Sequence, residues 1–287
     1  MEKRRSFYLL IFTLVLVMDG KIFISETIAN PLPGPEVYNI GGIVTKTITF
    51  NLTNAEVVFD IDSTDFKNNI GISFDGNYTI FNPNNKSEII IYAPFSVEES
   101  VVNSNVTVEV NSTQISFDVG NAYDFGIEDW VWNYSLFELW TYIKCNITIP
   151  ENSSQTIRYK FDGLISKPLG GGTGEFSINY DLETSNAWSG NITERVEFRV
   201  HGKLPDRYSE YTRGVYEDRC IITDIDHGKI YSWEWNNERI NTLQVGIMYI
   251  SSFNWLRTIL IAVGITVPIS IIIITFVLIR RRRSRRL

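Results

Sequence analysis

Residues 105–119, "NVTVEVNSTQISFDV", alternate apolar and polar side chains on both sides of a short polar segment. Successive side chains of a β-strand point to opposite faces of its sheet, so this period of two predicts two strands with one face toward a core. The apolar positions are Val106, Val108 and Val110 in the first run and Ile115, Phe117 and Val119 in the second.

The same alternation extends outward along the chain. In residues 44–53, "VTKTITFNLT", Phe50 and Leu52 share the apolar face and Asn51 lies on the polar one. Further short β-type runs are separated by clusters of Asn, Gly, Asp and Pro, and no long amphipathic helical pattern occurs before residue 251. The sequence therefore predicts an all-β chain with one or two antiparallel β-sandwich units of the immunoglobulin-like kind.

A change in composition near residues 120–126, where aromatic side chains become dense, indicates a division of this β region. We expect a linker at residues 30–42, a first β-sandwich unit at 43–122 and a second at 123–251. One continuous sandwich over both ranges is the alternative.

The N-terminus has the pattern of a secretory signal peptide. Three basic residues precede an apolar run at residues 7–18, which would rise only about 18 Å as a helix and is too short for a bilayer core of about 30 Å. A basic segment before a short apolar one is typical of secretory signals. We place the signal peptide at residues 1–29, with cleavage after Ala29 preferred and cleavage at Gly20 as the alternative.

The C-terminus has the pattern of a membrane anchor. Residues 258–279 carry no formal charge and would span about 33 Å as a helix, enough to cross a bilayer. Six arginines follow in residues 280–287, and basic residues beside a membrane helix favour the cytoplasmic side. We therefore predict a single-pass type I protein at the cell membrane, with an extracytoplasmic ectodomain and a cytoplasmic tail.

Sequons for N-glycosylation support the same orientation, because all of them lie between the two apolar segments. The nine candidate sites are Asn51, Asn77, Asn85, Asn105, Asn111, Asn133, Asn146, Asn152 and Asn191.

The charge of the predicted ectodomain limits its partners. Residues 31–254 contain 30 Asp and Glu against 15 Lys and Arg. An acidic exterior argues against nucleic acid and anionic lipid as ligands and is compatible with cations or basic partners. The chain has two cysteines, Cys145 and Cys220, which we expect to form one disulfide in an oxidising compartment.

The run at residues 221–238, "IITDIDHGKIYSWEWNNE", brings together Asp224, Asp226 and His227, one of the two histidines of the chain. Two carboxylates and an imidazole at this spacing are weak candidates for a metal site, with Ca²⁺ as the best ion if another loop contributes oxygen ligands. A hairpin turn is the simpler interpretation. Alternating runs flank the pair His227 and Gly228, and a turn there would place Asp226 opposite Lys229.

Tryptophans occur as two pairs at strand spacing, Trp130 with Trp132 and Trp233 with Trp235. Residues two apart on a strand share a face, and such pairs most often fill a core. Trp188 lies in a polar segment, "TSNAWSGN", and is our candidate for an exposed aromatic that binds a ligand such as a sugar ring.

Sequence motifs for catalysis are absent. The two histidines, His201 and His227, cannot supply a His-rich zinc site, and no His-Glu-x-x-His, Cys-x-x-Cys or Gly-x-Ser-x-Gly motif occurs. The glycine run at residues 168–176 is followed by an alternating strand pattern, whereas a phosphate-binding loop precedes a helix. Carboxylates are abundant, but the sequence singles out no pair for glycoside hydrolysis.

Two segments, residues 76–96, "GNYTIFNPNNKSEIIIYAPFS", and residues 178–200, "INYDLETSNAWSGNITERVEFRV", resemble a group of signal-bearing, β-rich extracytoplasmic proteins of prokaryotes, many of them archaeal. The resemblance implies export and a β fold, and it carries over no catalytic residue.

These patterns predict a cell-surface interaction, adhesion or envelope module without enzymatic activity or cofactor. Its partners would be the membrane itself and an extracellular protein or glycan. The alternative is a membrane-tethered hydrolase that acts on carbohydrate outside the cytoplasm.

Overall fold

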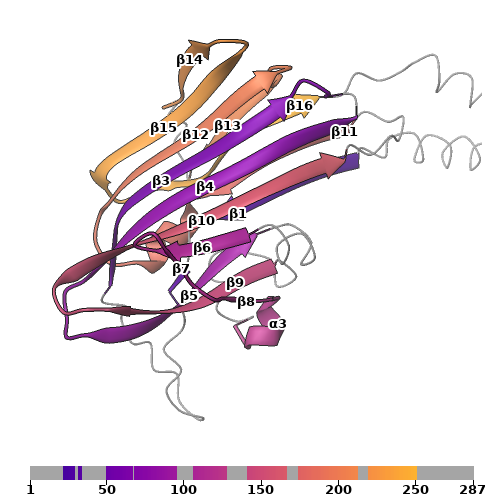
Figure 1. Ribbon diagram of the computed structural model, residues 1–287. Coiled ribbons are helices and arrows are strands. Elements are labelled where there is room, and N and C mark those ends of the chain that lie inside the picture. The colour runs from indigo at the N-terminus through magenta and orange to yellow at the C-terminus, as the bar shows by residue number, and fades with distance from the viewer. Residues whose placement is uncertain are drawn as a thin grey trace, which may run out of the picture. The chain divides into compact units, whose positions relative to one another are not determined.

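The fold is described from a computed structural model of the chain (Figure 1). The structure describes residues 22–29, 32–33, 50–66, 68–95, 106–127, 141–166, 174–212 and 219–250. Contacts between Cα atoms divide the chain into two compact units, and nearly all described residues belong to the unit formed by Ile24–Pro168 and Phe176–Tyr249. The predicted all-β class is confirmed, since these residues are mostly in strands.

Eight strands form sheet A, in the order β13-β16-β11-β1-β5-β9-β8, with β2 pairing to β5 outside this path. Their bounds are β1 (Ile22–Ala29), β2 (Leu32–Pro33), β5 (Ser87–Phe95), β8 (Asp118–Gly120), β9 (Thr141–Ile149), β11 (Gly174–Asp181), β13 (Arg207–Thr212) and β16 (Thr242–Ile250).

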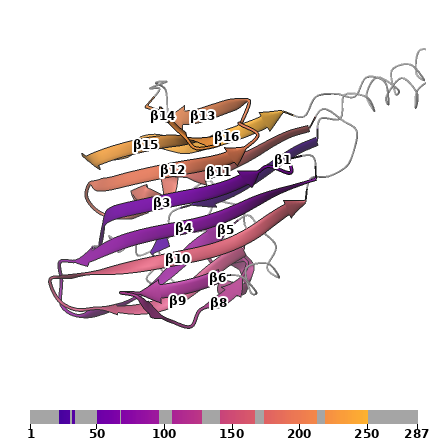
Figure 2. The same ribbon diagram turned by 45° about the horizontal axis from the view of Figure 1, so that its top comes forward.

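Eight further strands form sheet B, in the order β14-β15-β12-β3-β4-β10-β6-β7. Their bounds are β3 (Asn51–Ser63), β4 (Asn69–Asn82), β6 (Val106–Val110), β7 (Thr113–Gln114), β10 (Ser153–Ser166), β12 (Ile192–Gly202), β14 (Ile221–Ile225) and β15 (Gly228–Glu238). The pair β3–β12 is parallel, so sheet B is mixed, and the strands run across it as long diagonal bands in Figure 2. Two short helical turns, α3 (Ala122–Phe125) and η1 (Glu183–Ala187), lie between strands.

The apolar faces of the two sheets meet in one core. Phe59 of sheet B lies 6.1 Å from Tyr180 of sheet A, measured between ring centroids, and Phe74 of sheet B lies 6.0 Å from Phe95 of sheet A. Alternation explains this packing, because every second residue along β4 is buried and the residues between them are not. Edge-on contacts between aromatic rings add to the free energy gained from burying their area.

The two-unit arrangement that we expected would divide the core at residue 122, but the core is continuous across that position. Strands from both sides of that position pair within each sheet: β4 with β10 and β3 with β12 in sheet B, and β5 with β9 in sheet A. Local alternation could not reveal these partners, because pairing between strands far apart in sequence leaves no periodic signal.

Two further predictions concern the ends of the chain. Residues 22–29, the last part of the predicted signal peptide, form β1, which lies between β11 and β5 inside sheet A. The rest of that signal peptide and the predicted membrane helix at 258–279 lie outside the described residues. Within the part of the chain that the structure describes, no helix has the length and apolar character needed to cross a membrane.

Candidate functional site

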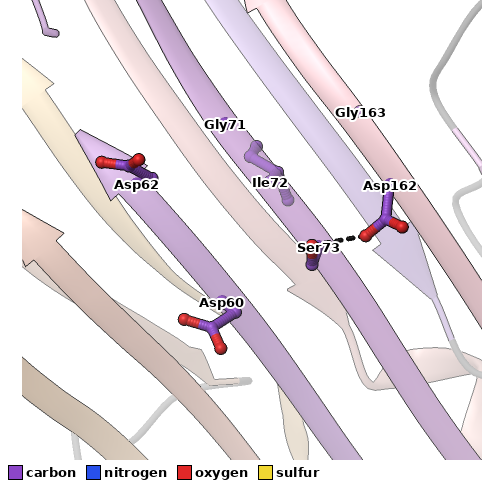
Figure 3. Close-up of a pocket in the computed structure, with 7 residues that line it drawn as sticks. All are labelled: Asp60, Asp62, Gly71, Ile72, Ser73, Asp162 and Gly163. Atoms are coloured by element: carbon purple, nitrogen blue, oxygen red, sulfur yellow. Dashed lines mark hydrogen bonds between the residues drawn. The ribbon is translucent and has the colours of Figure 1, made fainter. Parts of the chain in front are cut away.

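A hollow of about 270 Å³ lies on the outer face of sheet B, away from the core. Figure 3 shows that Asp60 and Asp62 lie along one strand, β3, and that Asp162 of β10 approaches Ser73. The lining residues are Asp60, Asp62, Gly71, Ile72, Ser73, Asp162 and Gly163.

Strand register explains why these residues meet. Ser73 of β4 pairs with Asp60 of β3 on one side and with Asp162 of β10 on the other, which forms one row across three strands. In the next row, Asp62 pairs with Gly71. Gly71 has no side chain on the outer face, so the space that a larger residue would fill stays open. The hollow therefore results from one glycine beside three aspartates.

Hydrogen bonds orient the carboxylates. The hydroxyl of Ser73 donates to Oδ1 of Asp162 at 2.5 Å. Oδ1 of Asp62 accepts a hydrogen bond from the hydroxyl of Thr64 at 2.6 Å and one from its backbone N–H at 3.0 Å. These two bonds favour the ionised form and hold the pKa of Asp62 below its usual value. Asp62 is therefore an anion at neutral pH.

A histidine lies beside the hollow on a fourth strand, β12. Nε2 of His201, on β12, lies 3.2 Å from Oδ1 of Asp60, and both side chains are about half exposed. The hollow thus presents several carboxylate oxygens and one hydroxyl to solvent, and the His201 imidazole lies next to Asp60 at its border. Such a surface can accept hydrogen bonds and attract positive charge.

Sequence reasoning missed this hollow, because its residues come from three strands that the alternation alone could not align. The available signal was weak: Asp60, Asp62 and Gly71 alternate with apolar residues at 59, 61, 70 and 72, which is the pattern of outward strand positions. No group of three or more His, Cys, Asp or Glu side chains with metal-binding geometry occurs among the described residues.

The candidate metal ligands Asp224 and Asp226 lie in a hairpin, although its register differs from our prediction. Ile225 pairs with Gly228 and Asp224 with Lys229, so the two-residue turn is Asp226 and His227. Nζ of Lys229 lies 3.1 Å from Oδ1 of Asp224. The predicted pairing of Asp226 with Lys229 is therefore wrong by two residues.

The backbone explains the difference in register. His227 adopts a positive φ of 60°, so the left-handed position of the turn is occupied by His227. Gly228 has another role, since a Cβ placed there would lie 1.9 Å from the carbonyl oxygen of Val200 on β12. The glycine is needed because β12 passes close to it, and the turn moves one position toward the N-terminus.

The predicted disulfide does not form in the structure, where Cys145 and Cys220 are not bonded to each other. Cys145 points into the core from β9 in sheet A, with its Sγ 3.5 Å from the hydroxyl oxygen of Tyr159. Burial raises the pKa of the Cys145 thiol to about 11. Cys220 precedes β14 at the edge of sheet B and is only partly buried.

The tryptophans are in the core wherever the structure describes them. Trp233 and Trp235 are fully buried, as the core interpretation of this pair predicted. Trp188 is only 6% exposed, so its ring does not form the exposed ligand-binding aromatic that we expected. The segment around it folds inward, and η1 ends at the residue before it. Trp130 and Trp132 lie outside the described residues.

Seven of the nine sequons can be placed, and none of their asparagine side chains is buried. These seven are Asn51, Asn77, Asn85, Asn111, Asn146, Asn152 and Asn191. Asn105 and Asn133 lie outside the described residues.

A second set of carboxylates is buried where β11 ends. Asp181 and Glu183 are 8% and 5% exposed, and Oδ1 of Asp181 accepts a hydrogen bond from the backbone N–H of Glu183 at 2.8 Å. Burial raises the pKa of Asp181 to about 7, with a smaller contribution in the same direction from the charge of Glu183. A carboxyl group with such a pKa can exchange a proton near neutral pH.

No family model and no curated protein matches the chain. Among solved structures, the chain is similar to a candidate nutrient-binding protein from Legionella pneumophila, with a TM-score of 0.53 and 14% sequence identity over 79% of this chain and 71% of that one. At this identity the likeness shows the fold alone.

Weaker likenesses involve parts of larger enzymes. An M1 zinc metallopeptidase from Deinococcus radiodurans has a TM-score of 0.34 and 10% identity, over 70% of this chain and 42% of that one. Native yeast LTA4 hydrolase has a TM-score of 0.35 and 11% identity, over 71% of this chain and 29% of that one. These scores are too low to support an argument about function.

Proposed function

We propose that the chain is an exported, single-pass type I membrane protein whose acidic ectodomain acts as a non-enzymatic interaction or adhesion module at the cell surface. The support comes first from sequence. An apolar segment at residues 258–279 is followed by six arginines, and the sequons lie on its N-terminal side. The membrane helix anchors the protein, and residues 280–287 stay in the cytoplasm.

The observation that carries this proposal is the accessibility of the sequons. An oligosaccharide can be attached only to an asparagine that reaches solvent. Seven asparagines occupy accessible positions in strands and turns, and three of them, Asn51, Asn77 and Asn146, are accessible although the residues on both sides are buried. Asn146 is exposed between the buried Cys145 and Ile147, for example. This arrangement fits a glycosylated ectodomain.

The ectodomain is proposed to be a β-sandwich, larger than an immunoglobulin domain. Immunoglobulin-type sandwiches have about seven to nine strands in all. Here each sheet has eight strands, and sheet B contains the parallel pair β3–β12. The hollow beside Asp60, Asp62 and Asp162 offers hydrogen-bond acceptors to an extracellular protein or glycan partner. The candidate nutrient-binding function of the Legionella protein is compatible with a ligand-binding role.

Mass spectrometry of glycopeptides from the protein, purified from its native cells, tests the proposal. We expect glycans on several of the seven described sequons. The variant Asn111→Gln is the control and should lose its own glycopeptide while the others remain. A protein that carries no glycan at any sequon would remove the main support for the proposal.

A second function, extracytoplasmic hydrolysis of carbohydrate, is favoured by the buried carboxylates at the end of β11. Glycoside hydrolysis uses two carboxyl groups, one with a raised pKa that serves as the acid. The pKa of Asp181, about 7, suits that role, and Glu183 lies two residues away. Incubation of the full-length protein with an oligosaccharide panel tests this alternative. Cleavage that is lost in Asp181→Asn would establish it, and the absence of cleavage would leave the interaction module.

A further inference from the structure

The described sequons are unevenly distributed between the two ends of the sheets, which we name after the terminal residues of β3. The Ser63 end is where β3 and β12 finish and β4 begins, as shown by the pairs Ser63 with Gly202 and Asp62 with Gly71. The opposite Asn51 end is where β3 begins and β4 finishes, as shown by the pair Asn51 with Phe81.

All seven described sequons lie in the half of the sheets nearer the Asn51 end. Asn77 is the innermost of them and pairs with Glu56 on β3, five residues from Asn51. Asn111 lies beside Thr156, and its side chain accepts a hydrogen bond from the backbone N–H of that residue. The other positions are Asn51 at the start of β3, Asn85 between β4 and β5, Asn146 near the end of β9, Asn152 between β9 and β10, and Asn191 just before β12.

The sequon on sheet A, at Asn146, also lies toward the Asn51 end. The side-chain Nδ2 of Asn82, at the end of β4, donates to the backbone oxygen of Ile149 at the end of β9. This contact places the end of β9, and with it Asn146, at the Asn51 end.

The strand that leads toward the predicted membrane helix runs to the opposite end. β16 finishes at Ile250, and the ring of Tyr249 lies 5.1 Å from the ring of Phe66 in the turn between β3 and β4. The backbone N–H of Asp206, just after β12, donates to the carbonyl oxygen of Met248 at 2.9 Å. β3 and β16 therefore run in the same direction, as Figure 2 shows, and β16 ends at the Ser63 end.

We propose that the seven described sequons form a glycan cap on the end of the sheets turned away from the membrane, and that the Ser63 end faces the lipid surface. This inference rests on the proposed function. Seven residues lie between Ile250 and the start of the predicted helix at residue 258, and the eight Cα-to-Cα steps span at most about 28 Å. The 13 residues of β3 extend about 43 Å. If the Asn51 end faced the membrane, Ile250 would lie about that far from it, and the linker is too short to cover this distance.

The arrangement has a consequence for the acidic hollow. Asp62 and Gly71 pair one residue from the end of β3, and Asp162 lies near the end of β10. The hollow is therefore in the half of sheet B that carries no described sequon. Glycans at the Asn51 end leave it uncovered, and its partner must approach close to the membrane.

Energy transfer from two labelled positions to the bilayer tests the proposal. The full-length chain, as Asp65→Cys or Glu151→Cys in a Cys220→Ser background, is labelled with a donor dye and reconstituted into phosphatidylcholine vesicles that contain a headgroup-labelled acceptor lipid. Both replaced residues are exposed acidic turn residues, Asp65 at the Ser63 end and Glu151 at the Asn51 end, and the buried Cys145 is retained. The Cys220→Ser protein without a further cysteine gives the background.

We expect transfer at least about twofold higher from position 65 than from position 151, because the two ends are about 40 Å apart. Equal transfer, or higher transfer from position 151, would overturn the proposed orientation and leave membrane anchoring intact. No transfer from either position would contradict membrane insertion, and with it the proposed function. If Asp65→Cys does not fold, Leu204→Cys in the turn after β12 replaces it, since Leu204 is 36% exposed at the same end.

Discussion

Across the β14–β15 hairpin, Nζ of Lys229 lies 3.1 Å from Oδ1 of Asp224, and the two residues are direct partners in the register. Asp226, the other carboxylate at this tip, is a turn residue. Both aspartates are exposed, and the side chain of Asp224 is 84% exposed, which limits the strength of its ion pair.

A double-mutant cycle distinguishes the two possible registers. We expect a coupling free energy of about 0.2–1 kcal/mol between Asp224→Asn and Lys229→Gln, the usual range for a cross-strand pair of opposite charge. The matched cycle with Asp226→Asn should give coupling close to zero. The measurement is the free energy of unfolding of the full chain in detergent, followed by tryptophan fluorescence. Coupling at 226 without coupling at 224 would contradict the register.

Replacement by alanine should change the free energy of unfolding differently at Gly228 and at Gly71. At Gly228 a Cβ would lie 1.9 Å from the backbone oxygen of Val200, so Gly228→Ala must push β12 and β15 apart. We expect a loss of about 1–3 kcal/mol in the free energy of unfolding. At Gly71 the nearest atom is Cβ of Asp62 at 3.6 Å, an ordinary contact, so Gly71→Ala should change stability little. Equal losses in the two variants would contradict the close approach of β12.

Asp181 predicts a pH dependence of stability. Its pKa is raised to about 7 in the folded chain, so the folded state holds this proton more tightly than the unfolded state. The resulting stabilisation is complete below about pH 4 and is lost as the pH rises to about 7. At about 1.4 kcal/mol per pKa unit, the change amounts to about 4 kcal/mol.

Unfolding of the wild type and Asp181→Asn between pH 4 and pH 8 measures this contribution. The variant should lack most of the decrease between pH 4 and pH 7, because its amide does not ionise and can still accept the hydrogen bond from Glu183. Asp226→Asn, an exposed turn variant, should follow the wild type. A pH profile of Asp181→Asn identical to that of the wild type would show that Asp181 ionises normally.

Several features of the fold could be predicted from the sequence because they depend on local alternation. The strand character, the buried pair Trp233 and Trp235, and the outward position of Asn146 all follow from a period of two. Even the incorrect hairpin register kept each side chain on its face, because an error of two residues preserves the alternation.

Other features depend on neighbours that lie far away in the sequence. The parallel pairing of β3 with β12 joins residues about 140 positions apart, and no local pattern indicates it. Gly228 was expected in the turn because nothing nearby in the sequence indicates that Val200, on another strand, passes close to it. Trp188 was expected at the surface because its flanking residues are polar, yet the segment is folded inward. The acidic hollow requires the alignment of three strands, which only the structure supplies.

The position of β1 makes a prediction about processing of the N-terminus. Ile28 pairs with Phe95 of β5, and β1 lies between β5 and β11 within sheet A. Cleavage after Ala29 would remove this strand from the interior of the sheet, whereas cleavage at Gly20 would retain it. We therefore expect the mature N-terminus before Ile22. N-terminal sequencing of the protein from its native membrane checks this, and a mature chain that begins at Asn30 would contradict the placement of β1.

Protease treatment of intact cells tests the central claim, export of the ectodomain with the arginine tail inside, most directly. We predict that the protease removes the sequon-bearing region while an epitope attached after Leu287 stays protected until the cells are permeabilised. A cytoplasmic protein of the same cells serves as the control for membrane integrity. An ectodomain that remains intact under conditions in which the terminal epitope is digested would contradict the account.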